Sequence, residues 1–276
     1  RHPMLLPCSV AECYSMAIEA FDVAEQLQTP VFVMTDLDLG MNTWMSDPFP
    51  YPTTPINRGK VLDEAKLRQL GAQWGRYADV DGDGIPYRTV PTDGLPPYFA
   101  RGSGHNAKGQ YSERADDYGL NVDRLSKKFE TARRVVPQPE IAWNAKAKIG
   151  IIAYGTSHFS VEESRDQLRD ERQIETSYYR LRAYPFAPSL WEFFDKHDRV
   201  YVVEQNRDAQ MAALMRLEIT PERLAKLRNV LHYNGLPIDA RSITDDVLVQ
   251  EGLRPPVPAE LKHSMVGSTP AAGAGE

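Results

Sequence analysis

The first 34 residues hold the feature that most constrains the fold: an apolar run, a helix and a second apolar run. The first run is Met4–Leu6, and Ser9 with Glu12 has the spacing of a capping box, in which hydroxyl and carboxylate satisfy backbone N–H groups at a helix start. The apolar stripe of this helix comprises Val10, Cys13, Ala17, Ala20, Ala24 and Leu27. Pro30 ends the helix, and the run Val31–Met34 is typical of a strand covered by helices on both faces. Two strands joined through a helix predict a parallel sheet.

A second α/β rhythm begins near residue 147, after a long middle section without one. Residues 40–58 and 79–119 are rich in Pro, Gly, Asn and Ser, which predicts loops with short strands, and residues 125–136 have a helical pattern. Ser160 with Glu163 has the spacing of another helix start. The remaining expected elements are strands at 148–154, 178–184 and 200–204 and helices at 190–194 and 207–217. The sequence therefore predicts two α/β parts separated by a loop-rich region.

The composition narrows the classes of partner. The chain has 32 basic and 38 acidic residues, well mixed, so no face is predicted to bind nucleic acid. It has neither an apolar run of the roughly 18 residues that span a membrane nor a signal peptide, so we expect a cytoplasmic protein without a membrane partner. Cys8 and Cys13 are the two cysteines, too few for an iron–sulfur cluster, which would have to sit on another chain. Residues 254–276 lack apolar bulk and are expected to be a disordered tail.

The stretch DVDGDGIPYR begins like a calcium loop. Asp79, Asp81 and Asp83 occupy the first three ligand positions of such a loop, and Gly84 occupies the sixth. The twelfth position, where a bidentate carboxylate closes the calcium site, is Val90. We therefore expect a tight turn between a helix and a strand with no metal in it, and keep calcium binding as the alternative.

Polar residues follow the run Val31–Met34 directly. Asp36, Asp38 and Asn42 would lie beyond the carboxyl end of that strand, at the edge where parallel sheets bind ligands. Two carboxylates there could hold Mg²⁺, and they could equally cap the turn that follows. We take these three residues as a candidate sheet-edge site.

The loop RGSGH holds a second candidate site. Gly102 and Gly104 let the backbone approach a ligand closely, and Arg101 and His105 could contact a carboxylate, a phosphate or a thioester. A plain flexible loop is the alternative interpretation of the same spacing.

Two further turns end predicted strands. The stretch IIAYGTSHFS offers a helix amino end to an anion, but its single glycine does not match the three of a dinucleotide-binding fingerprint. Glu204, Gln205 and Asn206 end another strand, and Asn206 could simply cap the next helix. Neither turn identifies a ligand.

Seven stretches, taken in order, carry a resemblance to a known family. They are TPVFVMTDLDLGMNTWMSDPF, DVDGDGIPYRTVP, YFARGSGHNAKGQYSE, DRLSKKFETARRVVP, KIGIIAYGTS, VYVVEQNRDAQMAALMRLE and LRNVLHYNGLPIDAR. Together they cover most of residues 1–253 and resemble the alpha subunit of 2-oxoacid:ferredoxin oxidoreductases, closest to the 2-oxoglutarate type.

The resemblance implies an α/β fold with an incomplete thiamine-diphosphate-binding domain of the pyrimidine type, built on a parallel sheet, followed by a transketolase C-terminal-like α/β domain. Residues 1–50 would be the second half of the pyrimidine-binding domain, 51–146 a loop-rich connecting region with helices, and 147–253 the transketolase C-terminal-like domain. The chain opens on Arg1 and lacks the upstream part of the family's pattern. We therefore expect a fragment that is inactive alone.

The resemblance also implies an oxidoreductase that decarboxylates a 2-oxoacid with coenzyme A and reduces ferredoxin. Thiamine diphosphate, Mg²⁺ and a [4Fe-4S] cluster would belong to the complete complex, mainly to its beta subunit, with none bound by this chain alone. The loop of Arg101, Gly102, Gly104 and His105 would lie near the entrance for the 2-oxoacid substrate or coenzyme A. No catalytic residue is assigned by the resemblance.

Two alternatives stay open at the level of sequence. Another thiamine-diphosphate enzyme, of the transketolase or pyruvate dehydrogenase kind, would share the α/β rhythm of the second half. A non-catalytic, calcium-stabilised binding module would use the acidic loop that begins at Asp79.

Overall fold

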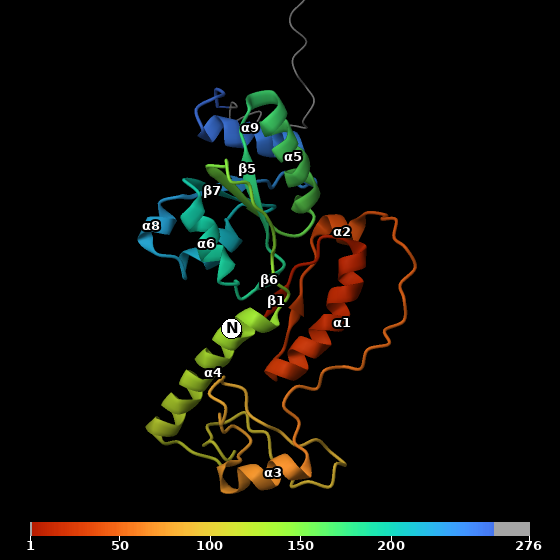
Figure 1. The fold of residues 1–276 in the computed structure, drawn as a ribbon, viewed down its shortest axis with the longest axis vertical. Helices are drawn as coiled ribbons and strands as arrows, with labels where there is room; N and C mark the ends of the chain where they lie inside the picture. Colours follow the sequence, from red (N-terminus) through yellow and green to blue (C-terminus); the bar gives the residue numbers. More distant parts are fainter. Residues whose placement is uncertain (1, 257–276) are drawn as a thin grey trace, which may run out of the picture.

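The structure, a computed structural model, describes residues 2–256 and contains two sheets with a loop-rich region beside the smaller one (Figure 1). The chain begins with β1 (Met4–Leu5), α1 (Val10–Leu27), β2 (Phe32–Val33) and the short α2 (Leu37–Met41). Strand β1 pairs in parallel with β2 and antiparallel with β6 (Ala183–Tyr184). The smaller sheet therefore takes one of its strands from the second half of the chain.

The parallel β-α-β unit predicted at the amino terminus is confirmed, with two corrections. Ser9 Oγ accepts a hydrogen bond from the Glu12 N–H, as expected, but the Glu12 carboxylate accepts from the Cys8 N–H and not from Ser9. The prediction that the second strand is buried on both faces is wrong. Phe32 is 51% exposed and Met34 50% exposed, because β2 is the edge strand of its sheet and no helix covers its outer face in the part of the chain described.

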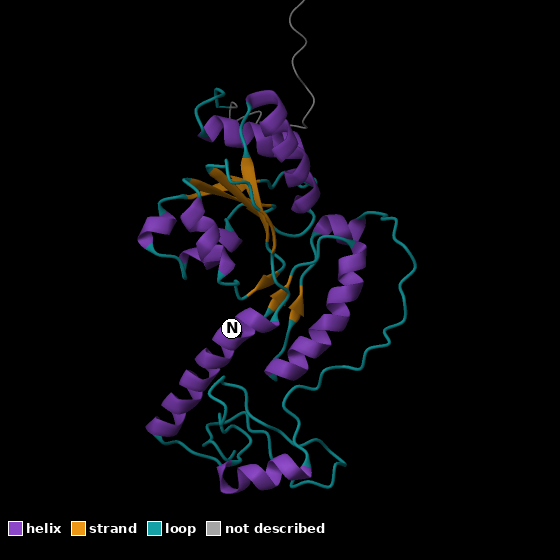
Figure 2. Ribbon diagram, viewed as in Figure 1, coloured by secondary structure: helices purple, strands orange, loops and turns teal. Residues whose placement is uncertain are grey.

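Residues 43–114 are mostly loops, as their Pro and Gly content predicts (Figure 2). Two short helices, α3 (Glu64–Leu70) and η1 (Gly71–Gln73), interrupt them, and α4 (Ala115–Val135) leads out of the region. Isolated bridges join Val61 to Arg88 and His105 to Tyr111, so the loops fold back on one another. We call residues 60–114 the loop region.

The second α/β rhythm forms a five-stranded sheet in the order β3-β5-β4-β7-β8. Its strands are β3 (Glu140–Ala142), β4 (Ile149–Ala153), β5 (Thr176–Arg180), β7 (Arg199–Glu204) and β8 (Leu227–Leu231). Its helices are α5 (Ser157–Arg172), α6 (Ser189–Lys196), α7 (Gln210–Arg216), α8 (Pro221–Leu224) and α9 (Ala240–Gln250). All neighbouring strands are parallel except β3 and β5, which are antiparallel.

Helices cover both faces of this sheet, which explains the apolar runs of its central strands β4 and β7 (Figure 1). On one face Val202 belongs to the same buried cluster as Phe193 of α6. On the other face Ile151 belongs to a cluster with Val161 of α5 and Val247 of α9. Within residues 2–256, no helix has both the length and the apolar character needed to cross a bilayer.

The helix start expected at Ser160 is wrong. Helix α5 begins three residues earlier, at Ser157, directly after the Gly155–Thr156 turn. The Ser160 hydroxyl instead donates to the Ile238 carbonyl at 2.6 Å, which ties α5 to the loop before α9. The hydroxyl therefore makes a contact between distant segments, which local spacing cannot show.

A buried guanidinium joins the amino-terminal helix to the larger sheet. Arg180, whose side chain is 5% exposed at the end of β5, donates to both carboxylate oxygens of Glu12, at 2.8 and 2.9 Å. It also donates to Cys8 Sγ at 3.1 Å and forms a second ion pair with Glu140 at 2.5 Å. Burial alone would raise the pKa of the Glu12 carboxyl, but the hydrogen bonds from Arg180 and from the Cys8 N–H outweigh it and lower this pKa to about 2.

Acid should therefore lower the stability of the fold by protonating the Glu12 carboxylate. Because its pKa falls from an ordinary value of 4.5 to about 2 on folding, the carboxylate stabilises the fold above about pH 4.5 and loses that effect as the pH falls towards 2. We expect the free energy of unfolding to drop by roughly 2–3 kcal/mol more in the wild type than in Glu12→Gln between about pH 5 and about pH 2. Glu140→Gln, which removes the more exposed partner of Arg180, should show a smaller difference. Urea unfolding at a series of pH values measures this, and a constant gap between wild type and Glu12→Gln would contradict it.

Candidate functional site

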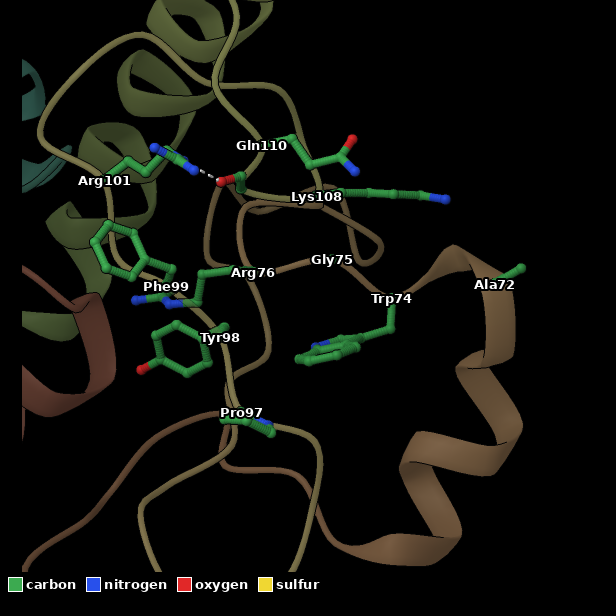
Figure 3. Close-up of a pocket in the computed structure, with 11 residues that line it drawn as sticks. Ala72, Trp74, Gly75, Arg76, Pro97, Tyr98, Phe99, Arg101, Lys108 and Gln110 are labelled. Carbon is green, nitrogen blue, oxygen red and sulfur yellow. Dashed lines mark hydrogen bonds between the residues drawn. The ribbon is translucent and has the colours of Figure 1, made fainter.

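A pocket of about 470 Å³ opens in the loop region (Figure 3). It is lined by Ala72, Trp74, Gly75, Arg76, Pro97, Tyr98, Phe99, Arg101, Lys108, Gly109 and Gln110. Three separate segments therefore form its wall: the end of η1 with residues 74–76, residues 97–101, and the turn at 108–110. Its volume is within the range of pockets that bind small molecules.

The wall combines aromatic rings with basic side chains. The Arg76 guanidinium lies 4.9 Å from the ring centre of Tyr98 and 5.1 Å from that of Tyr77. Arg101 Nε donates to the Gly109 carbonyl at 2.8 Å, drawn as the dashed line in Figure 3. Within residues 2–256, no carboxylate forms an ion pair with Arg76, Arg101 or Lys108, although many other basic side chains of the chain have such a partner. The pocket is therefore electropositive and fits an anion.

Of the four residues predicted in the RGSGH loop, only Arg101 lies in the pocket wall. His105 stacks on the Tyr77 ring with ring centres 3.8 Å apart, and its Nδ1 is 3.1 Å from the Asn106 carbonyl oxygen. Gly104 is required by packing, since a Cβ there would lie 2.4 Å from the Ser112 carbonyl oxygen, whereas Gly102 has open space around it. The candidate loop thus separates into one pocket residue and a folded turn.

Sequence reasoning missed Trp74, Arg76, Tyr98 and Lys108. A signal was present, because WGRY and YFAR each place a basic residue within three positions of an aromatic ring. Such pairs form cation–π contacts and are typical of surfaces that bind phosphates with flat rings. Nothing in the sequence shows that the loops bring the two stretches together.

The acidic turn of DVDGDG surrounds a lysine. Lys60 Nζ donates to Asp81 Oδ2 at 2.7 Å, to Asp83 Oδ1 at 2.8 Å and to the Ile85 carbonyl at 3.0 Å. The ammonium group therefore occupies the position between the carboxylates that a calcium ion would need. Gly84 packs against α4, where a Cβ would lie 2.2 Å from the backbone nitrogen of Lys128. Close packing therefore explains why this position is a glycine.

Calcium should therefore leave the chain unchanged, and loss of the lysine should not. We expect millimolar Ca²⁺ to give no shift in melting temperature, because Lys60 already neutralises Asp81 and Asp83. Lys60→Ala should lower the free energy of unfolding by roughly 1–2 kcal/mol, and more than Lys127→Ala, whose ion pair with Asp79 is 3.4 Å long and exposed at the lysine. Thermal unfolding with and without Ca²⁺ tests both, and stabilisation of the wild type by Ca²⁺ would favour the calcium alternative.

The predicted sheet-edge residues divide between a buried contact and the surface. Asp36 caps α2 by accepting from the Leu39 N–H at 3.0 Å. Its Oδ2 also accepts from the Thr156 N–H at 2.7 Å and the Thr156 hydroxyl at 2.8 Å. Asp38 accepts from the Asn42 side-chain amide on the surface of α2. Of these three residues, only Asp36 therefore contacts the second half of the chain among the contacts of residues 2–256.

This contact identifies the anion at the turn of IIAYGTSHFS as the side chain of Asp36. The amino end of α5 receives the Asp36 carboxylate, and Gly155, with φ of +60°, makes room for it because a Cβ there would lie 2.5 Å from Asp36 Oδ2. Gln205 Nε2 reaches the hydroxyls of Thr156 and Ser157, each at 3.2 Å. Three stretches that the sequence singled out separately therefore meet at one place.

Glu204, beside Gln205, is fully buried and used by the fold. Its carboxylate accepts from the N–H groups of Met211 and Ala212 at the start of α7 and from the amide of Asn206. Capping is therefore shared: Glu204 binds Met211 and Ala212, and Asn206 Oδ1 accepts from the Gln210 N–H at 3.2 Å.

The side chains of residues 2–256 do not fit a Mg²⁺-diphosphate centre or an iron–sulfur cluster. Within residues 2–256, no three His, Cys, Asp or Glu side chains are grouped so that they could hold a metal. Asp36 is engaged by Thr156, and the Cys8 thiol accepts a hydrogen bond from Arg180. Burial, which outweighs Arg180, raises the pKa of this thiol to about 12, so it stays protonated.

Asp36 should matter more to the fold than its neighbour Asp38. Asp36→Ala removes the acceptor for Leu39 and Thr156, so we expect a loss of roughly 1–3 kcal/mol in the free energy of unfolding. Asp38→Ala, which removes an exposed contact only, should change it by less than about 0.5 kcal/mol. Hydrogen exchange at the Thr156 amide gives a local measurement, and it should speed up in Asp36→Ala alone. Equal exchange in both variants would show that the contact does not hold the turn.

Comparison with known proteins gives the same family as the sequence pattern. Residues 2–56 match a family model described as the thiamine-diphosphate-binding domain of pyruvate flavodoxin/ferredoxin oxidoreductase. The alpha subunit of 2-oxoacid:ferredoxin oxidoreductase 2 from Aeropyrum pernix is 28% identical over 236 residues, which are 82% of this chain and 35% of that protein. The resemblance is confirmed.

Two further oxidoreductase relatives extend the comparison. The 2-oxoglutarate synthase subunit KorA from Methanothermobacter marburgensis is 27% identical over 73% of this chain and 52% of its own length. A structure of 2-oxoglutarate:ferredoxin oxidoreductase from Magnetococcus marinus, with 2-oxoglutarate, coenzyme A and succinyl-CoA bound, superimposes with a TM-score of 0.75 at 22% identity. It covers 92% of this chain and 42% of the other. The α/β fold with parallel sheets is thereby confirmed, while the chain spans about a third to a half of the length of these relatives.

Proposed function

We propose that this chain is part of the alpha subunit of a 2-oxoacid:ferredoxin oxidoreductase of the 2-oxoglutarate type. The reaction is oxidative decarboxylation of the 2-oxoacid with coenzyme A, which gives acyl-CoA, CO₂ and reduced ferredoxin. The observation that carries the proposal is that one family accounts for nearly the whole chain: the fold matches over 92% of it, and a sequence named as an alpha subunit matches over 82% of it.

Within that function we assign the parts of the chain as follows. Residues 1–50 are the second half of a pyrimidine-binding domain. Residues 51–146 are a loop-rich region with helices that connects it to a transketolase C-terminal-like domain, residues 147–253. The first assignment is supported by the family match at residues 2–56, and the last by the parallel strands β5, β4, β7 and β8 with helices on both faces. The predicted tail, residues 254–276, lies almost entirely outside the described residues.

The cofactors are proposed to lie mainly on a beta subunit in the cytoplasm. When bound, thiamine diphosphate supplies the carbanion chemistry, and a [4Fe-4S] cluster passes electrons to ferredoxin. The role of this chain is to shape the site and to admit its substrates.

Two surfaces of the chain are candidates for contact with substrate. The loop of Arg101, Gly102, Gly104 and His105 is placed near the coenzyme A entrance, and the electropositive pocket beside Arg101 supports this. Asp36, Asp38 and Asn42 are the second candidate, a site at the sheet edge, where Asp36 contacts the other half of the chain through Thr156.

Activity of the assembled complex tests the proposed function. The complex of this protein with its beta subunit should reduce a viologen dye with 2-oxoglutarate and coenzyme A together, and pyruvate should be a poorer substrate. Omission of coenzyme A should lower the rate, since the acyl group then has no acceptor. Reduction of NAD⁺ without a ferredoxin-type acceptor would instead favour an enzyme of the pyruvate dehydrogenase kind.

A further inference from the structure

The pocket of the loop region has two chemically different sides, and one ligand class matches both. One side carries Arg76 and Arg101, which lie over the rings of Tyr98 and Phe99 and have no carboxylate partner within residues 2–256, and the other carries the indole of Trp74 (Figure 3). We propose that this pocket binds the phosphorylated adenosine end of a nucleotide ligand, with the phosphates on Arg76 and Arg101 and the purine on Trp74. The choice of adenosine rests on the proposed function, in which coenzyme A accepts the acyl group.

The basic side is prepared for phosphate. Arg76 lies over the Tyr98 ring, and its Nε is buried without a hydrogen-bond partner in the described structure. Arg101 uses Nε for the Gly109 carbonyl, and its Nη atoms donate no hydrogen bond within residues 2–256. A guanidinium that is fixed by one contact and has donors left over can bind a phosphate through two parallel hydrogen bonds.

Further positive charge lies behind this wall. Arg124 is 5.6 Å from the centre of the Tyr77 ring, on which Arg76 also lies. Burial, together with the charges of Arg124 and Arg76, lowers the pKa of Lys128 to about 8. These basic groups therefore repel one another in the absence of an anion, and a bound phosphate would relieve that repulsion.

The aromatic side presents a fixed ring. Trp74 Nε1 donates to the Tyr87 carbonyl at 3.3 Å, which restrains the indole. Figure 3 shows the indole pointing into the space between the Arg76 segment and Pro97. Stacking of a base on such a ring contributes roughly 1–3 kcal/mol.

The turn that closes the pocket is also rigid before any ligand binds. Asn106 Oδ1 accepts from the N–H groups of Lys108 and Gln110, at 3.0 and 3.1 Å. Gly75 lets this turn approach, because a Cβ there would lie 2.5 Å from the Ala107 carbonyl oxygen. Little backbone ordering is therefore needed on binding, which favours affinity.

Calorimetric titration of the full chain tests the pocket with three probes: adenosine 3′,5′-bisphosphate, adenosine and inorganic pyrophosphate. We expect the bisphosphate to bind saturably and roughly tenfold or more tightly than either of the others, because only it fills both sides. Arg76→Gln and Trp74→Leu should each weaken it by roughly tenfold. Lys127→Gln, which removes the same charge on α4 outside the pocket, should leave the affinity unchanged.

Several outcomes would overturn the assignment. No saturable binding, pyrophosphate binding as tight as the nucleotide, or equal weakening by Arg76→Gln and Lys127→Gln would each do so. In the assembled complex, Arg76→Gln should raise the KM for coenzyme A and leave kcat with saturating coenzyme A near the wild-type value. If the complex is active and this KM is unchanged, the pocket assignment fails while the proposed function stands. If the chain binds the nucleotide but the complex does not oxidise 2-oxoglutarate, the proposed function fails while the pocket stands.

Discussion

The Arg180 guanidinium holds the amino-terminal unit against the larger sheet. It lies where β5 ends, just before the chain crosses to β6 and enters the smaller sheet. Its main partner, Glu12, is in the first turn of α1, so one buried pair fixes a helix of the first sheet to a strand of the second. A buried pair of this kind adds little net stability compared with apolar packing, but breaking it leaves an uncompensated charge. Its effect is therefore to specify one arrangement of the two sheets.

Asp36 makes a second connection, beyond the carboxyl end of β2. Asp36 follows the last strand of the first β-α-β unit. Its carboxylate also accepts a hydrogen bond from the Thr156 N–H at the amino end of α5. Glu12 lies in the first turn of α1, and Asp36 lies close to Cys13 of the same turn, so both carboxylates act at the amino end of this helix. A site built there would consequently have fixed walls, as precise placement of substrate requires.

Local pattern predicted the elements better than it predicted their surroundings. The β-α-β unit and the strands of the second half could be read from apolar runs, since periodicity is a property of each segment. The exposure of Phe32 could not be read, because it depends on which strand lies at the edge of the sheet. The contact of Ser160 and the wall formed by Trp74 and Arg101 depend on loops that bring distant residues together, and short-range spacing carries no record of that. Order along the whole chain carried the family resemblance where single motifs could not.

The lysine inside the DGDG turn has a consequence for how acidic loops are interpreted. Asp81 and Asp83, together with the Ile85 carbonyl, form a cluster of oxygens that needs a cation at its centre. Lys60 supplies that cation from 21 residues away in sequence and is part of the same covalent chain, so the turn keeps its counter-charge at any concentration of metal. A consensus that records only the first six positions of a calcium loop therefore selects for the shape of the cluster. It does not distinguish an ion taken from solution from one that the protein carries itself.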